Sequence, residues 1–344
     1  MGATTLMSNK VSVFAPASIG NVSVGFDVLG LAVKPIDGFL LGDVVSVESS
    51  SNDDLVVTGD FANKLPVKKE ENIVWQCLKL FNEKLITLEH FPIAVKLTLN
   101  KKMPVGSGLG SSACSIVAAL HALNAFYEKR LQQPLFTPEN LLKMMGQMEA
   151  SISGSLHYDN VAPCFLGGLQ LMISDETIIS RNLPNFNDCY YVMAYPAINV
   201  STKAARDVLP KHYSRVDLIH YGQYLAAFVD ACHRGDKQQA FAMLIDVVAE
   251  PYRKELLPQY QQSKDYLLAQ GALAVGISGS GPTLFCVTDN KAQAEQFAHW
   301  LKDNYLQTDK LQTGKLQAQA DIDEGFVHIC QADQQGSIVL HEEK

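Results

Sequence analysis

The segment Met103-Pro104-Val105-Gly106-Ser107-Gly108-Leu109-Gly110-Ser111-Ser112-Ala113 precedes a strongly apolar stretch that runs to Phe126. Ahead of it, residues 93–99 place a large apolar side chain at every second position, with alanine, lysine and threonine between them, the period of a half-buried strand. Three alternate glycines let backbone N–H groups approach a ligand closely, and a helix that begins at the serines presents free N–H donors there. The segment predicts a strand–loop–helix unit that binds polyphosphate, although a purely structural tight turn would use the same residues.

Three familiar phosphate-binding loops do not fit this segment. A P-loop requires a lysine after its last glycine, but Ser111 follows Gly110. A dinucleotide-binding fingerprint requires a third glycine where Ser111 stands and an acid about 20 residues further on, where the sequence has Lys129 and Arg130. A protein kinase would also need H-R-D and D-F-G motifs, which the sequence lacks. The loop therefore points to another class of phosphate-binding protein.

The amino-acid composition indicates what kind of protein this is. The 344 residues are 47% hydrophobic and 19% charged, which fits a globular protein of about two domains at roughly 100–200 residues each. Residues 1–10 lack the charged-then-apolar plan of a signal peptide and no run of about 18 apolar residues occurs, so we expect a soluble, cytoplasmic protein that does not bind membranes. Seven cysteines without a C-x-x-C pair indicate reduced packing residues.

The charge balance argues against one class of partner. A formal net charge of −8, with no cluster of lysine and arginine to offset it, disfavours non-specific binding to nucleic acid. An anionic substrate would have to be held by local devices, such as helix N-termini, a metal ion and one or two buried arginines.

The order of predicted elements is that of an α+β protein. Thr137 as N-cap and Pro138 at the first helical position are favourable start signals for one of its helices. Strands are expected at residues 11–15, 43–48, 93–99, 169–173, 190–194, 272–277, 283–287 and 326–330. Helices are expected at residues 73–85, 138–150, 218–231, 238–249, 258–270 and 291–304. Residues 308–323 are expected to form a solvated excursion, and a domain boundary is placed near residue 172.

Two further motifs accompany the glycine-rich loop. Residues 15–27 read APASIGNVSVGFD, and residues 276–283 read GISGSGPT. In this order the three segments resemble the motifs of the GHMP small-molecule kinases, whose second motif, P-x-G-x-G-L-G-S-S-[AS], wraps the phosphates of ATP. The resemblance covers nearly the whole chain. It implies an S5-like N-terminal domain over residues 1–172, a ferredoxin-like C-terminal domain over residues 173–344, and an active site between them.

Within that family the chain is most similar to the homoserine kinases. The segments that carry this similarity are GSLHYDNVAP (154–163), VSTKAAR (200–206) and EPYR (250–253). The resemblance implies phosphorylation of L-homoserine to O-phospho-L-homoserine in threonine biosynthesis, with ATP and Mg²⁺ as cofactors and a homodimer as the usual assembly. One departure is that many relatives have glycine where Ser23 stands, a position expected to lie in a turn.

The resemblance also implies which residues hold the amino acid. They are Asn21, Asp27, His157, Thr202, Arg206 and Arg253. Guanidinium groups can bind a substrate carboxylate through two hydrogen bonds, and Asp27 or Asn21 can accept hydrogen bonds from an ammonium. Taken singly, either arginine could instead be a solvated surface charge, and His157 could be a histidine of the core.

The nucleotide and metal positions follow from the same resemblance. The implied ATP-binding residues are Pro104, Val105, Gly106, Ser107, Gly108, Leu109, Gly110, Ser111, Ser112, Ala113 and Cys114. Ser112 and Glu149 match the magnesium positions of the family, where a divalent ion bridges the β- and γ-phosphates. The plain alternative for Glu149 is an exposed acid at a helix end. Residues 276–283 are expected to close over the phosphates from the second domain, and their plain alternative is a Gly-Pro hairpin turn between two strands, which is compatible with that role.

The predicted catalytic residues are Asn160, Glu149 and Ser112. Many GHMP kinases have an aspartate where Asn160 stands, and there it can act as a general base. A neutral amide cannot accept the proton, so we hypothesise that this protein works by positioning and electrostatic stabilisation without a side-chain base. The alternatives are another GHMP kinase acting on mevalonate-pathway compounds or sugars, a non-catalytic ATP-binding module, and a dehydrogenase.

Overall fold

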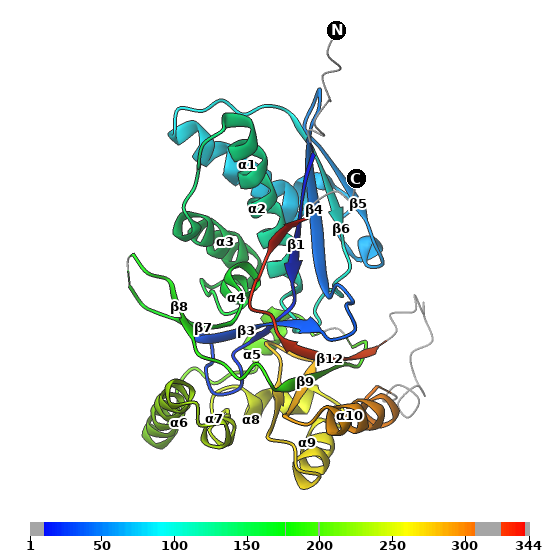
Figure 1. Ribbon diagram of the computed structural model, residues 1–344, viewed down its shortest axis with the longest axis vertical. Helices are drawn as coiled ribbons and strands as arrows, with labels where there is room; N and C mark the ends of the chain where they lie inside the picture. The colour runs from blue at the N-terminus through cyan, green and yellow to red at the C-terminus, as the bar shows by residue number, and fades with distance from the viewer. Residues whose placement is uncertain (1–9, 176, 199, 307–324, 341–344) are drawn as a thin grey trace.

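Figure 1 shows the computed structural model, which describes residues 10–175, 177–198, 200–306 and 325–340. The described chain forms two sheets with helices packed against them, which confirms the α+β fold class. The first sheet has the order β13-β1-β4-β6-β5, and only the β5–β6 pairing is parallel. Its strands are β1 (Lys10–Pro16), β4 (Gly42–Ser49), β5 (Asp54–Thr58), β6 (Val95–Asn100) and β13 (Ile338–Leu340). Helices α1 (Ile73–Thr87), α2 (Ser111–Leu131) and α3 (Pro138–Ser153) lie beside it (Figure 1).

The second sheet has the order β10-β11-β9-β12-β3-β7-β8, and β2 pairs with β3 off this path. Its strands are β2 (Ser18–Gly20), β3 (Leu29–Pro35), β7 (Leu169–Met172), β8 (Ser180–Leu183), β9 (Tyr190–Tyr195), β10 (Ala274–Ile277), β11 (Leu284–Thr288) and β12 (Phe326–Ala332). Because β12 pairs with both β9 and β3, strands from the two ends of the chain share this sheet. The predicted boundary near residue 172 follows β7 directly and stays a prediction.

Short and long helices complete the fold. In the view of Figure 1, α6 to α10 lie below the second sheet. Their bounds, with those of the two helices nearer the middle, are α4 (Val161–Leu166), α5 (Thr202–Asp207), α6 (Arg215–Arg234), α7 (Lys237–Ala242), α8 (Glu250–Arg253), α9 (Tyr260–Ala269) and α10 (Lys291–Asn304). Turns of 3-10 helix occupy Ala62–Lys64, Lys69–Glu71 and Lys254–Leu256.

Local signals explain where helices begin and end. The Thr137 hydroxyl accepts a hydrogen bond from the Asn140 N–H at 3.3 Å, which confirms the predicted start of α3. The helix expected over residues 238–249 is wrong beyond Ala242, where α7 ends. There the carboxylate of Asp246 accepts hydrogen bonds from the backbone N–H groups of residues 248–250, so the side chain competes with helix continuation and starts α8 instead.

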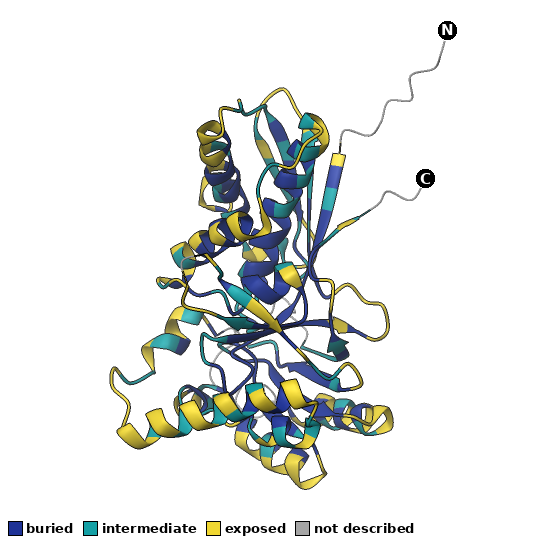
Figure 2. Ribbon diagram, turned by 60° about the vertical axis from the view of Figure 1, so that its left-hand side comes forward, coloured by how far each residue is buried: buried dark blue, intermediate teal, exposed yellow. Residues whose placement is uncertain are grey.

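Burial follows the layers of the fold. Helix α2 is buried on nearly all sides because it contacts β1 and β4 on one side and α1, α3 and α4 on others, whereas α6 keeps a long exposed face (Figure 2). All seven cysteines are buried and free, as predicted for packing residues. Among the described residues, no helix combines the length and apolarity needed to cross a bilayer. The predicted excursion at residues 308–323 lies outside the described part of the chain.

Candidate active site

A cavity of about 600 Å³ is lined by residues from both halves of the chain. It brings together all the residues predicted to hold the amino acid, namely Asn21, Asp27, His157, Thr202, Arg206 and Arg253. It is also lined by the predicted catalytic residues Ser112, Glu149 and Asn160. The loop residues that line it are Val105, Gly106, Ser107, Gly108, Gly110, Ser111 and Ser112. The side chains of Leu109, Ala113 and Cys114 are instead fully buried in the core.

The glycine-rich loop adopts the conformation that its glycines permit. Gly106, Gly108 and Gly110 have φ values of 70°, 78° and 70°, in the left-handed region that side chains disfavour. Space is also short, since a Cβ on Gly108 would lie 2.4 Å from the carbonyl oxygen of Ser278. Helix α2 begins directly after Gly110, so its first N–H groups face the same cavity as the loop.

The third motif closes against this loop. It joins β10 to β11 as a turn, and its Ser278 hydroxyl donates a hydrogen bond to the Gly108 carbonyl at 2.8 Å. The Thr283 hydroxyl donates to the Ser107 carbonyl at 2.7 Å. Residues 276–283 are therefore both the predicted turn between strands and a support for the glycine-rich loop, while their closure over the phosphates stays a prediction.

Ser112 and Glu149 meet at the start of α2. The Ser112 hydroxyl lies 2.9 Å from each oxygen of the Glu149 carboxylate. Glu149 is only 5% exposed, so the reading of it as an exposed helix-end acid is wrong. Burial raises the pKa of Glu149, although the nearby His157 and the Ser112 hydroxyl oppose that rise. A buried carboxylate that shares its site with a neutral hydroxyl fits the oxygen ligands that a divalent cation prefers.

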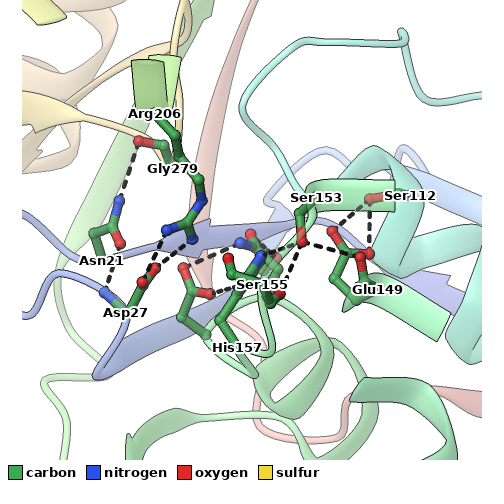
Figure 3. A network of polar contacts seen from close by, with 12 residues as sticks. Asn21, Asp27, Ser112, Glu149, Ser153, Ser155, His157, Arg206 and Gly279 are labelled. Carbon is green, nitrogen blue, oxygen red and sulfur yellow. Dashed lines mark hydrogen bonds and ion pairs between the residues drawn. The ribbon is translucent and has the colours of Figure 1, made fainter. Parts of the chain in front are cut away.

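Four residues form what we call the charged wall: Asn21, Asp27, Arg206 and Arg253 (Figure 3 shows the first three). Arg206 donates two hydrogen bonds to the Asp27 carboxylate, at 2.7 and 3.0 Å. Burial alone would lower the pKa of Arg206, but the hydrogen bond and charge of Asp27 raise it overall. Asn21 connects the backbone of Asp27, at 2.9 Å, to the Gly279 carbonyl, at 3.1 Å.

Arg253 is held more deeply than Arg206. It is 3% exposed, and its guanidinium donates hydrogen bonds to the carbonyls of Ala205, at 3.0 Å, and Gly279, at 2.8 Å. Burial lowers its pKa. Both guanidinium groups of the wall lie over the ring of Phe26, at 5.3 Å for Arg253 and 5.6 Å for Arg206. Arg206 and Arg253 are therefore not solvated surface charges, the alternative that the sequence had left open for each of them.

His157 is fixed by the protein on both sides of its ring. Its Nδ1 lies 2.7 Å from the Asp159 carboxylate and its Nε2 lies 3.0 Å from the Ser153 hydroxyl (Figure 3). Burial alone would lower its pKa, but the hydrogen bond and charge of Asp159, with the charges of Glu149 and Asp27, raise it above the ordinary value. The raised pKa favours the positively charged form of this ring, which lines the cavity.

The first motif turns through a left-handed segment before it reaches the wall. Asn21, Val22 and Ser23 have φ values of 67°, 46° and 56°, which confirms the turn expected at Ser23. Such values are rare for residues other than glycine. The Ser23 hydroxyl is buried and has no hydrogen-bond partner among the described residues. This turn sets the position of Asp27 at the cost of local strain.

The chain matches two family models, described as GHMP kinases N terminal domain at residues 72–168 and GHMP kinases C terminal at residues 228–306. It is 31% identical to the homoserine kinase from Cytophaga hutchinsonii, with a TM-score of 0.82 over 99% of this chain and 100% of that one. This chain belongs to the GHMP kinase family. A Listeria monocytogenes structure assigned provisionally as a homoserine kinase is 20% identical, with a TM-score of 0.64 over 96% of this chain and 100% of that one. The L. major mevalonate kinase is 14% identical, with a TM-score of 0.65 over 96% and 98%. The last two support the fold.

As a GHMP kinase, the protein is a phosphotransferase. Its glycine-rich loop is held by a buried ion pair between Lys101 and Asp43, which the sequence analysis did not predict. The Lys101 ammonium, 1% exposed, lies 2.6 Å from the Asp43 carboxylate and donates to the Ser111 carbonyl at 2.8 Å. Asp43 also accepts the backbone N–H groups of Lys102 and Met103 at 3.0 Å, so one ion pair ties both ends of the loop. This pair joins residues 58 positions apart in the chain, and no local pattern in the sequence indicated it.

Two further residues of this GHMP kinase site were missed. Asp159 stands between His157 and Asn160 in the sequence motif and bonds to both side chains. Ser18 bonds to Asn160 from β2. Both carry polar side chains inside motifs that had already been singled out, but a motif does not show which of its members contact one another.

Proposed function

We propose that this GHMP kinase is a homoserine kinase that transfers the γ-phosphate of ATP to the side-chain hydroxyl of L-homoserine, giving O-phospho-L-homoserine for threonine biosynthesis. The observation that carries the proposal is the charged wall, which presents one carboxylate and two guanidinium groups to one cavity. An α-amino acid carries the complementary ammonium and carboxylate. The 31% identity to the Cytophaga homoserine kinase supports the same substrate.

The pairing within the wall favours a substrate with both charges. Asp27 and Arg206 satisfy one another through two hydrogen bonds. A zwitterion can replace both partners at once, because its ammonium binds Asp27 while its carboxylate binds Arg206 and Arg253. Mevalonate has only the carboxylate and would take Arg206 from Asp27 without giving Asp27 a cation. Such a loss of a partner from a partly buried charge pair is costly. A sugar has neither charge and would bind to neither the carboxylate nor the guanidinium groups through a charge.

The opposite side of the cavity fits ATP. The left-handed glycines and the first turn of α2 expose backbone N–H groups to it, and these groups bind phosphate oxygens without a charged side chain. We propose that Ser112 and Glu149 hold Mg²⁺, which would neutralise charge that builds up between the β- and γ-phosphates. The two side chains already meet at 2.9 Å and so supply two oxygen ligands at one place.

The proposed reaction does not need a side-chain base. Asn160 lines the cavity with a neutral amide, the Asp27 carboxylate is bonded to Arg206, and both ring nitrogens of His157 are bonded to the protein. Phosphoryl transfer through a loose transition state leaves little charge on the attacking hydroxyl early on, so its orientation matters more than early removal of its proton. We therefore assign Asn160 to orient the acceptor hydroxyl.

A substrate panel tests the proposed function. ADP release is measured with MgATP and homoserine, mevalonate, galactose, serine or threonine, and ³¹P NMR identifies the product. Homoserine should be phosphorylated fastest, with O-phosphohomoserine as product. Faster turnover of mevalonate or galactose would assign the protein to another branch of the family, and absence of turnover with every acceptor would favour a non-catalytic ATP-binding module.

A further inference from the structure

The side-chain amide of Asn160 is held between two other side chains. Its Nδ2 donates a hydrogen bond to the Asp159 carboxylate at 3.1 Å, and its Oδ1 accepts one from the Ser18 hydroxyl at 3.0 Å. Ser18 is fully buried on β2, and Asp159 is 3% exposed just ahead of α4. Asn160 is therefore contacted from two separate elements, one on each side of its amide.

The chemistry of these neighbours fixes which way the amide points. An ionised carboxylate only accepts hydrogen bonds, so the Nδ2 of Asn160 must face Asp159 and the Oδ1 must face Ser18. Each contact uses half the hydrogen-bonding capacity of its own atom, Nδ2 or Oδ1. One N–H of Nδ2 and one lone pair of Oδ1 are left, and Asn160 lines the cavity. A reversed amide would place Nδ2 against Ser18 and Oδ1 against the negative carboxylate.

Two glycines make room for this arrangement. A Cβ on Gly20 would lie 2.6 Å from both the Asn160 Nδ2 and an Asp159 carboxylate oxygen. The φ of Gly20 does not lie in the left-handed region, so a lack of space for a side chain, and not the backbone conformation, accounts for glycine at this position. A Cβ on Gly110, in the phosphate-binding loop, would lie 2.4 Å from the Ser18 hydroxyl and 3.1 Å from the Asn160 Oδ1. The first and second motifs thus both enclose the amide.

Asp159 is itself held in place by His157. The His157 Nδ1 lies 2.7 Å from one carboxylate oxygen of Asp159, and its Nε2 lies 3.0 Å from the Ser153 hydroxyl. Because a carboxylate only accepts hydrogen bonds, Nδ1 donates its proton to Asp159. This contact occupies one oxygen of Asp159 and leaves the other oxygen aimed at Asn160.

We propose that Ser18 and Asp159 are positioning residues that clamp the Asn160 amide, so that its remaining N–H and lone pair are presented to the acceptor hydroxyl. The inference rests on the proposed function, because it assigns the clamp to the reaction that Asn160 serves. It adds a specific claim: Ser18 and Asp159 affect turnover only through Asn160.

A double-mutant cycle on kcat tests this claim, because residues that act through a common group have non-additive effects. In Asp159→Asn the new side chain faces two donors, the His157 Nδ1 and the Asn160 Nδ2, and can accept from only one, so the amide is released. We expect kcat to fall roughly tenfold to 100-fold, as for other small misplacements of a reacting group, with the KM for ATP unchanged. In an Asn160→Ala background the same change should alter kcat by less than about twofold.

An equal loss in both backgrounds would overturn the clamp and leave Asp159 a structural residue. Ser18→Ala removes a single oxygen atom and gives the same test if Asp159→Asn does not fold. Asp333→Asn is a matched control, since Asp333 is a buried acid that bonds the backbone N–H groups of Gln335 and Gly336, and it should have the same small effect in both backgrounds. The acceptor panel on the wild type tests the proposed function separately, and the cycle can be run with whichever acceptor it identifies.

Discussion

The two sides of the cavity are built by different means. The phosphate side consists of backbone from one continuous segment, the loop at residues 105–112 and the first turn of α2. The charged wall consists of side chains that come from three separate segments, near residues 21–27, 202–206 and 250–253, and the carbonyl of Gly279 accepts hydrogen bonds from two of them. A phosphate chain is common to every kinase of the family, so backbone N–H groups suffice to bind it. The acceptor differs between members, and side chains supply that difference.

The two sides should respond differently to mutation. Backbone donors persist when a side chain is exchanged, so the phosphate side is sensitive only where a side chain carries charge or where a glycine is needed. In the charged wall, removal of one side chain leaves its partner partly buried and unpaired, as Asp27 would be without Arg206. The following predictions test this contrast, from the largest expected effect to the smallest.

Glu149 is the one carboxylate on the phosphate side whose loss should be severe. Glu149→Gln removes the negative charge that we propose binds Mg²⁺, so kcat should fall by roughly 100-fold or more, as when a single electrostatic contact to a transition state is lost. Steady-state kinetics at increasing Mg²⁺ concentration measures both the rate and the metal requirement.

Glu139→Gln is the matched control, because Glu139 is an exposed acid in the first turn of the same helix. It should leave kcat and the metal requirement unchanged. If Glu149→Gln also preserved both, the metal ligand would have to be another acid.

Arg206→Lys and Arg253→Lys should act on the acceptor alone. An ammonium cannot reproduce the two-point contact of a guanidinium, so the KM for homoserine should rise about tenfold to 100-fold while the KM for ATP stays constant. Arg234→Lys, on the exposed end of α6, is the control and should change neither constant. An unchanged KM for homoserine in both wall variants would place the substrate carboxylate elsewhere.

The contrast between the two sides also explains what the sequence could and could not predict. The glycine-rich loop and the Thr137 cap are local patterns, so both could be inferred from neighbouring residues. The pairing of Asp27 with Arg206 joins positions far apart in the chain, and only the resemblance to a family placed both at one site. The Lys101–Asp43 pair and the Ser18–Asn160–Asp159 contacts depend on tertiary packing and had no signal of their own. The predicted helix beyond Ala242 was wrong because the side chain of Asp246 bonds its own backbone.

We expect His157 to hold the substrate and not to act as a base. Because its pKa is raised in the folded protein, its contribution to stability is complete below the unfolded value of about 6.5 and is lost as pH rises through the folded value. The difference in free energy of unfolding between wild type and His157→Gln should therefore shrink as pH increases from about 6.5 upward. Chemical denaturation at several pH values measures it.

The kcat of the wild type should show no ionisation of a base between about pH 6 and 8. A limb in the kcat profile that disappeared in His157→Gln, with homoserine affinity intact, would make His157 the base and overturn the proposed mechanism.

The smallest effect is expected at the strained turn that leads to the charged wall. Ser23→Gly removes a side chain from a left-handed position together with a buried hydroxyl that has no partner among the described residues, so stability should increase by about 1 kcal/mol. Thermal unfolding measures it. Ser46→Gly is the control, because Ser46 lies within β4 and bonds Ser12, and it should lower stability. A loss of stability in Ser23→Gly would show that this turn is not strained.

The most direct test of the charged wall is the selectivity between homoserine and two analogues that each lack one charge. 4-Hydroxybutyrate has no ammonium for Asp27, and 3-aminopropan-1-ol has no carboxylate for Arg206 and Arg253, while both keep the hydroxyl at the same reach. With MgATP held constant, kcat/KM for homoserine should exceed that for each analogue by at least about 100-fold, since a site built to bond a group rejects substrates that lack it. Values for either analogue within a few fold of homoserine would contradict the assignment of this wall to a zwitterionic substrate.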